Sequence, residues 1–144
     1  MKAFTFGLEK VLTLREFHED EAKIELGRAI GVLSDLESRL FALARERVRA
    51  AAAQFTPGND AAVMQQYMFY ITRLDNLKEQ LLKEITIAEM KVEEAREAFF
   101  EASREQKVLD KLKDRRRKEY RKIVLAEETK TLDDAGNRGT ISTH

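Results

Sequence analysis

The feature that most constrains this chain is a seven-residue repeat of apolar residues in its second half. Only Arg116 interrupts the repeat, which occupies every seventh position from 74 to 123: Leu74, Leu81, Ala88, Ala95, Ala102, Leu109, Arg116 and Ile123. Further apolar residues widen this row: Leu77, Ile85, Val92, Phe99 and Leu112. Such a period is typical of a coiled-coil helix, which buries a narrow apolar stripe against another helix. We therefore expect a helix from about residue 60 to about residue 131.

The first half of the chain carries a similar stripe. Its apolar residues follow one another at spacings of three and four: Leu26, Ala29, Leu33, Leu36, Leu40 and Leu43. This pattern predicts a helix from about residue 3 to about residue 54, with polar interruptions at Arg15 and Glu19. Gly27 and Gly31 lie within it, and each costs about 1 kcal/mol relative to Ala. Either a bulky residue of the opposite helix packs against them, or they form a notch for a partner.

A single strong turn signal separates the two stripes. Pro57 and Gly58 are followed by Asn59 and Asp60, either of which could cap the next helix. Helices joined by so short a turn fold back on each other. We therefore expect an all-α fold, a long antiparallel two-helix coiled-coil hairpin with the second helix extending beyond the first. It forms one domain over residues 1–144, with the turn at 55–59 and a flexible tail at 133–144.

The register of this hairpin follows from the position of the turn. Pairing about residue 58 sets residue 8 opposite residue 108 and Phe4 opposite Leu112. The rest of the second helix then has no intramolecular partner. It includes Ile123, Val124 and Leu125, and exposed apolar residues of this kind indicate a binding surface.

Composition argues against several classes of function. The chain has 26 basic and 26 acidic residues, whereas a nucleic-acid-binding domain normally carries a basic excess. It has no Cys, and its two His, His18 and His144, have no second ligand at metal-binding spacing. Phosphate-binding and hydrolase motifs are also missing. We expect no catalytic activity, no cofactor, no metal and no nucleic-acid partner.

The sequence also bears on location. No run approaches the roughly 20 apolar residues that span a bilayer, and the N-terminus lacks an apolar run of signal-peptide length. We expect a cytoplasmic protein that can act peripherally at the inner face of the cell membrane.

Charge is unevenly distributed along the second helix. Residues 104–122 contain four acidic residues and ten basic ones: Arg104, Lys107, Lys111, Lys113, Arg115, Arg116, Arg117, Lys118, Arg121 and Lys122. The segment is either a solvated helix face or a surface that meets an acidic protein. Binding of RNA or of a membrane surface ranks third. Tyr120 alone gives no series of aromatic residues interleaved for base stacking, and Ile123, Val124 and Leu125 are too few to form a long membrane-inserting face.

Residues just after the turn are apolar on nearly every side of the predicted helix: Met64, Tyr67, Met68, Phe69, Tyr70 and Ile71. Tyr67 and Ile71 fit the buried stripe, whereas Phe69 does not. Aromatic residues and Met are enriched in protein–protein contacts, so the segment is either a binding surface or local packing at the turn.

Two segments resemble the FliJ family, small coiled-coil proteins of the bacterial flagellar export apparatus. The first is Phe4-x-Phe6-x-Leu8-Glu9-x-Val11-Leu12-x-Leu14-Arg15-Glu16. The second is Glu101-Ala102-Ser103-Arg104-Glu105-x-Lys107-Val108-Leu109-x-Lys111-Leu112, followed by Arg117 and Tyr120. Together with the length and the turn position, they extend the resemblance over about residues 4–132.

The resemblance implies a function in flagellar protein export and thus in motility. It implies a stalk-like adaptor that engages the hexameric export ATPase and the membrane export gate, and that escorts chaperones of late export substrates. A generic self-associating structural coiled coil is the alternative, although we expect a monomer.

The resemblance also implies site residues. The gate-binding surface of the family falls here on Leu43, Tyr70, Leu74 and Leu77. Other positions of that surface carry different residue types in this chain: Arg39, Glu46 and Ala50. We expect the ATPase to contact the basic part of the second helix, which gives these candidates: Arg115, Arg116, Arg117, Arg121 and Ile123.

Overall fold

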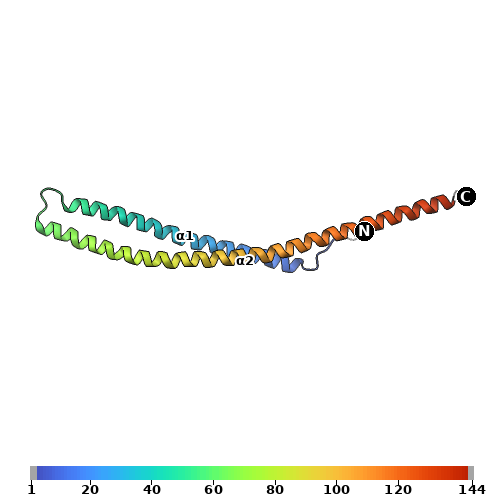
Figure 1. Cartoon of the computed structure of the whole chain (residues 1–144), viewed down its shortest axis with the longest axis horizontal. Coiled ribbons are helices and arrows are strands. Elements are labelled where there is room, and N and C mark those ends of the chain that lie inside the picture. Colours follow the sequence, from blue (N-terminus) through green and yellow to red (C-terminus); the bar gives the residue numbers. More distant parts are fainter. Residues whose placement is uncertain (1–2, 143–144) are drawn as a thin grey trace. The chain divides into compact units, whose positions relative to one another are not determined.

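The chain folds into two long helices that pack against each other in antiparallel orientation (Figure 1). The structure, a computed structural model, describes residues 3–142, and their side chains as far as residue 139. Helix α1 spans Glu9–Gln54 and helix α2 spans Ala61–Ser142. The described range contains no strand, and α2 is the longer helix. The predicted all-α hairpin is therefore confirmed.

The helix ends differ from the predicted ones. Helix α1 begins at Glu9 rather than at residue 3, because residues 3–6 are not helical and residues 7–8 form a turn in which the Glu9 N–H donates a 3.1 Å hydrogen bond to the Phe6 carbonyl. Helix α2 continues to Ser142, past the end predicted at residue 131 and through most of the tail expected to be flexible. No Pro follows Pro57, and the Gly residues of the tail weaken a helix without breaking it. Residues 143 and 144 lie outside the described range.

Packing divides the chain into two compact units, and both helices contribute to each. One unit is Asp20–Phe100, here called the tip unit because it contains the turn. The other is Met1–Glu19 with Glu101–His144, here called the terminal unit.

The tip unit is built on the predicted heptad positions. Leu36, Ile85 and Ala88 form its buried cluster, and three half-buried residues pack against them: Leu33, Leu40 and Leu81. These are residues of the two apolar stripes, so the period seen in the sequence determines which face of each helix is buried.

The turn uses the residues that its sequence predicts. Gly58 has a φ of +97°, a left-handed conformation that only Gly adopts without strain. The Asp60 carboxylate accepts a hydrogen bond from the Val63 backbone N–H at 2.8 Å, which caps α2. The Asn59 side-chain amide donates to the Ala53 and Gln54 carbonyls at 2.9 and 3.2 Å, which satisfies two of the free carbonyls at the end of α1.

Gly27 and Gly31 do not receive a bulky residue from the opposite helix. A Cβ atom added at either position would meet no heavy atom within 4 Å, and both residues are exposed. That packing prediction is wrong, because both glycines lie on the outer face of α1.

In the terminal unit the extended segment before α1 packs against α2. Phe6 is only 7% exposed, and the rings of Phe4 and Tyr120 lie 5.7 Å apart between centroids. Residues 3–8, here called the strap, therefore cover α2 as far as Tyr120.

The predicted register, which placed Phe4 opposite Leu112 and residue 8 opposite residue 108, is wrong. Glu9 pairs with Lys113 at 2.8 Å, and Arg15 forms an ion pair with Glu105. Phe4 then reaches Tyr120 because an extended segment advances farther per residue than a helix.

Candidate protein-binding surfaces

The strap binds two residues of the basic segment in the terminal unit. The guanidinium carbon of Arg116 lies 5.7 Å from the centre of the Phe6 ring, and that of Arg117 lies 5.7 Å from the centre of the Phe4 ring. A cation over an aromatic face at this distance is stabilised by about 0.5–1 kcal/mol when exposed to solvent. The strap thus favours one direction for each of the two side chains.

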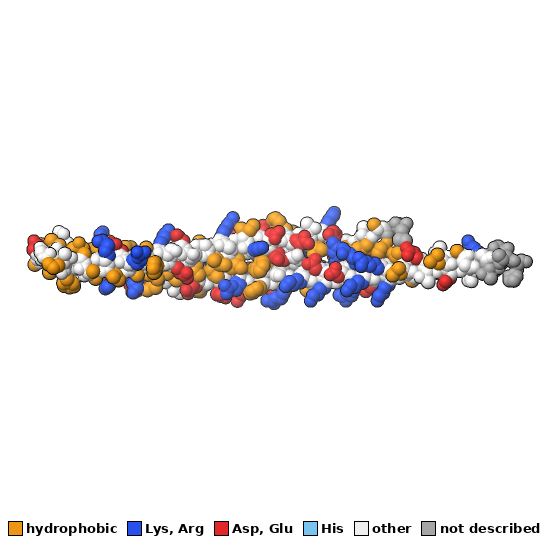
Figure 2. All heavy atoms as spheres, turned by 90° about the horizontal axis from the view of Figure 1, so that it is seen from above, with side chains coloured by type: hydrophobic (Ala, Val, Ile, Leu, Met, Phe, Trp, Pro, Cys, Tyr) orange, Lys and Arg blue, Asp and Glu red, His pale blue; other side chains and the backbone are white. Residues whose placement is uncertain are grey.

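Another face of the same helix carries a continuous basic row. Lys111, Arg115, Lys118 and Lys122 follow at spacings of four, three and four, so they share one side of α2. They line a shallow depression of about 430 Å³ together with Asp114 and Glu119. On the face that Figure 2 draws, Lys and Arg side chains gather to the right of the centre. We call these four residues the basic stripe.

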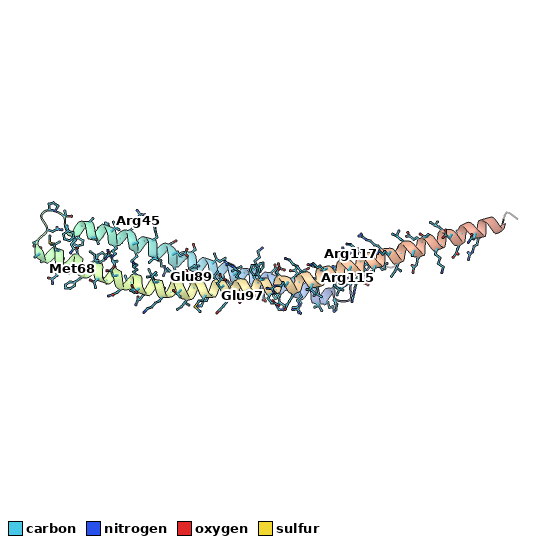
Figure 3. All side chains as sticks on the ribbon, in the orientation of Figure 1. Arg45, Met68, Glu89, Glu97, Arg115 and Arg117 are labelled. Atoms are coloured by element: carbon cyan, nitrogen blue, oxygen red, sulfur yellow. The ribbon has the colours of Figure 1, made fainter. Side chains whose placement is uncertain are left out.

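The predicted ATPase-contact residues do not form one patch. Arg115 belongs to the basic stripe, whereas Arg116 and Arg117 lie against the strap. Arg115 and Arg117, both labelled in Figure 3, are two residues apart and so leave α2 about 200° apart. Arg121 and Ile123 are exposed.

A polar cluster links the two helices on one side of the tip unit. The Tyr70 hydroxyl of α2 donates a 2.8 Å hydrogen bond to the Glu46 carboxylate of α1. Arg49 donates two more to the same carboxylate, at 2.9 and 2.5 Å. Arg49 and Tyr70 together lower the pKa of Glu46 from 4.5 to about 2. The same hydrogen bond raises the pKa of Tyr70, because the hydroxyl must keep its proton to donate to Glu46, and the Glu46 charge also disfavours the ionised phenolate.

A second cross-helix pair lies on the other side. Arg47 of α1 donates hydrogen bonds of 2.6 and 3.3 Å to the Asp75 carboxylate of α2. The pair lowers the pKa of Asp75 and raises that of Arg47, since each ion favours the charged form of the other. The two sides of the tip unit are thus each marked by a bonded pair.

The predicted gate-contact residues lie together near the polar cluster but differ in accessibility. Leu74 is buried and Leu43 is half-buried in the interface between the helices. Leu77 is exposed and Tyr70 half-buried, so these two present the accessible part of that surface.

The sequence-based prediction missed Phe4 and Phe6 as parts of a surface, although the signal was present. The alternation Phe4-x-Phe6-x-Leu8 has a period of two, which indicates an extended segment with one buried side. The burial of these residues follows that period: Phe6 is buried, Phe4 and Leu8 are half-buried, and Thr5 and Gly7 between them are exposed.

Within residues 3–142 no helix is long and apolar enough to cross a membrane. The described part of the chain likewise contains no group of three or more His, Cys, Asp or Glu side chains placed to hold a metal ion.

A comparison with known families matches nearly the whole chain to the family described as flagellar FliJ protein, over residues 4–142. The chain belongs to the FliJ family. No curated protein and no solved structure is similar enough to count as a match. Membership makes this FliJ-family chain a flagellar export-related protein. The match covers both units, including the strap from Phe4 onward, the basic stripe and the turn.

Proposed function

We propose that this FliJ-family protein is a stalk-like adaptor of flagellar export that acts by binding and catalyses no reaction. In this proposal it engages the hexameric export ATPase through the terminal unit and the membrane export gate through the tip unit. It also escorts chaperones of late export substrates, from the cytoplasm to the inner face of the membrane. The observation that carries the proposal is the family match over residues 4–142.

The charge of the terminal unit supports an ATPase contact there. Arg115 and Arg121 are exposed, and neither forms an ion pair with any side chain that the structure describes. Unpaired surface charge of one sign speeds encounter with an acidic surface and favours one orientation. Arg116 and Arg117 contribute to the same positive field while the strap holds them.

The accessible residues of the tip unit support a gate contact on the side of the polar cluster. Leu77 offers apolar surface, and Tyr70 is held in place by its hydrogen bond to Glu46. Side chains that are already ordered lose less entropy on binding. Leu43 and Leu74 support this surface from inside the helix pair.

The test is the rate of ATP hydrolysis by the purified hexameric export ATPase, with and without this protein. Reversing charge with Arg115→Glu and Arg121→Glu should abolish stimulation while circular dichroism still shows a folded hairpin. Lys23→Glu with Lys83→Glu, both exposed in the tip unit, makes the same change in net charge and should leave stimulation intact. Stimulation by the Arg115/Arg121 variant at the wild-type level would rule out this contact.

Sedimentation separates the adaptor from a self-associating coiled coil. Ile123 and Leu125 are exposed on α2 and could pair with a second copy. An adaptor sediments as a monomer at micromolar concentration. A stable dimer that Ile123→Gln and Leu125→Gln disperse would favour the structural coiled coil.

A further inference from the structure

One side of α2 in the terminal unit is lined with positive charge. Lys107 lies four residues before Lys111 and so continues the basic stripe by one turn. We call the basic stripe together with Lys107 the extended stripe. Its five residues fall within an arc of about 80° around α2 and extend over about 22 Å of its length. All five are exposed, and none forms an ion pair with a side chain that the structure describes. Arg115, labelled in Figure 3, is one of them.

Neither α1 nor the strap covers the extended stripe. Lys113, which pairs with Glu9 of α1, is two residues from Lys111 and so leaves α2 about 200° from it. Tyr120, which contacts the strap, is likewise two residues from Lys118. Both α1 and the strap therefore contact the far side of α2, and a flat surface can reach all five basic side chains at once.

Acidic residues flank the extended stripe without neutralising it. Between its two ends α2 carries Asp110, Asp114 and Glu119, and all three lie outside the arc. Asp110 and Asp114 share their flank with Arg117 and Arg121, which balance them. Glu119 alone then stands against five positive charges, so this side of α2 is strongly basic.

We propose that the extended stripe binds the surface of an anionic lipid bilayer, with α2 lying flat on the headgroups. The alignment of the charges is the first reason, because five basic residues on one exposed side of a helix can all contact a plane. The second reason is that four of the five are Lys, whereas protein–protein interfaces are enriched in Arg and depleted in Lys. Lys carries a compact charge that responds to charge density rather than to the geometry of a carboxylate.

Salt limits which other charges matter at such a surface. At physiological salt a charge acts over about 8 Å, and a helix is about 10 Å wide. The charges of α1 in the terminal unit are therefore screened when the extended stripe is in contact. Farther along α2, the first acidic residue in line with the stripe is Asp133, about 16 Å past Lys122. A chain with equal numbers of acidic and basic residues can thus bind an anionic surface by one side.

Exposed apolar side chains lie beside both ends of the extended stripe. Val108, next to Lys107, is 66% exposed, and Leu125, seven residues after Lys118, is 61% exposed. Both can enter the headgroup region and add apolar contact to the attraction between charges. Two such side chains do not insert a helix, so the contact depends mainly on charge and is reversible.

This inference goes beyond the proposed function, which assigns protein partners at the membrane but no lipid contact. Arg115 is shared with the proposed ATPase contact, so the test below leaves Arg115 and Arg121 unchanged. Vesicles of pure lipid contain neither the ATPase nor the gate. Vesicle binding and stimulation of the ATPase can therefore fail independently of each other.

The experiment measures co-sedimentation of the full chain with vesicles of phosphatidylglycerol and phosphatidylcholine in equal parts, and with vesicles of pure phosphatidylcholine. The test variant is Lys111→Gln with Lys118→Gln. The control is Lys10→Gln with Lys130→Gln, which makes the same change in net charge at two exposed residues of the terminal unit outside the extended stripe. Circular dichroism confirms that both variants are folded.

Wild type should bind the anionic vesicles but not the neutral ones, and added salt should weaken the binding. Each Lys near an anionic surface contributes about fivefold to affinity, so the test variant should bind at least about tenfold more weakly than wild type. The control should stay within about twofold of wild type, as for surface substitutions elsewhere.

Equal binding of wild type and the test variant would overturn the proposal, as would equal losses in the test variant and the control. An RNA oligonucleotide at the same salt tests the other polyanion. If it binds wild type more tightly than the anionic vesicles do, and the test variant loses that binding, the stripe is a nucleic-acid site and the proposal is wrong. Stimulation of the ATPase without any vesicle binding would leave the proposed function standing and overturn this inference.

Discussion

Removing the Phe6 side chain should open the terminal unit and leave the tip unit intact. Phe6 is 7% exposed, so Phe6→Ala removes nearly a full aromatic side chain from its packing against α2. Buried Phe→Ala changes cost about 3–5 kcal/mol, and the low end applies at the end of a helix pair, where the chain relaxes easily. Loss of the Arg116 contact adds about 0.5–1 kcal/mol.

Hydrogen exchange followed by mass spectrometry measures this effect locally. A loss of about 3 kcal/mol corresponds to roughly a hundredfold faster exchange where opening is local. We expect that acceleration in peptides from the start of α1, and unchanged exchange around Leu36 and Ile85 in the tip unit.

Phe17→Ala is the matched control, because Phe17 belongs to the same unit but is 56% exposed. It should change exchange by less than about threefold, as expected for a surface residue. Equal effects of the two substitutions, or no effect of Phe6→Ala, would refute the role assigned to the strap.

Gly58→Ala should destabilise the protein by about 1 kcal/mol or more, because the left-handed backbone of the turn strains any side chain. Gly27→Ala should stabilise α1 by about 1 kcal/mol, because a Cβ atom there meets no other atom and Ala favours a helix more than Gly does. A thermal unfolding series in which Gly58→Ala is not the less stable variant would contradict both assignments. The lowered pKa of Glu46 gives stability that is present above its ordinary pKa of 4.5 and is lost as the pH falls toward about 2. The melting temperature of wild type should therefore fall more between pH 5 and pH 2 than that of Glu46→Gln, and parallel curves would argue against the shift. Leu77→Ala should weaken binding to the cytoplasmic part of the export gate about tenfold without altering stability, measured by calorimetry, whereas a matching loss of stability would show a packing role.

The architecture was predictable because two simple signals agree. The heptad rows identify the buried faces, as Leu36 and Ile85 show, and Pro57 with Gly58 places the turn between the two helices. The cap at Asp60 was also predictable from its position before an apolar helix. Each of these features depends on residues close together in sequence.

The features that were missed depend on tertiary packing or on competing periods. Phe4 and Leu8 fit a continuation of the heptad pattern, which would extend the helix to residue 3. The chain before Glu9 is instead non-helical, and Phe6 is buried there against α2. The register was wrong for a different reason, because the pairing was centred on residue 58, whereas the Glu9–Lys113 pair centres it on residue 61. At the tip, the period could not show which side of Val48 or Tyr70 faces solvent, because this depends on the pairing of α1 with α2.

The strap covers α2 only as far as Tyr120. Farther along α2, the side chains of residues 125–139 are all exposed. Helix in that stretch depends on local propensity, and Gly136 and Gly139 lower it. Helicity of this kind declines gradually on warming, while a packed helix pair melts in one cooperative step. A ligand that needs this stretch as a helix must therefore restore the order that warming removes, so its affinity should fall with temperature well below the melting point of the paired helices.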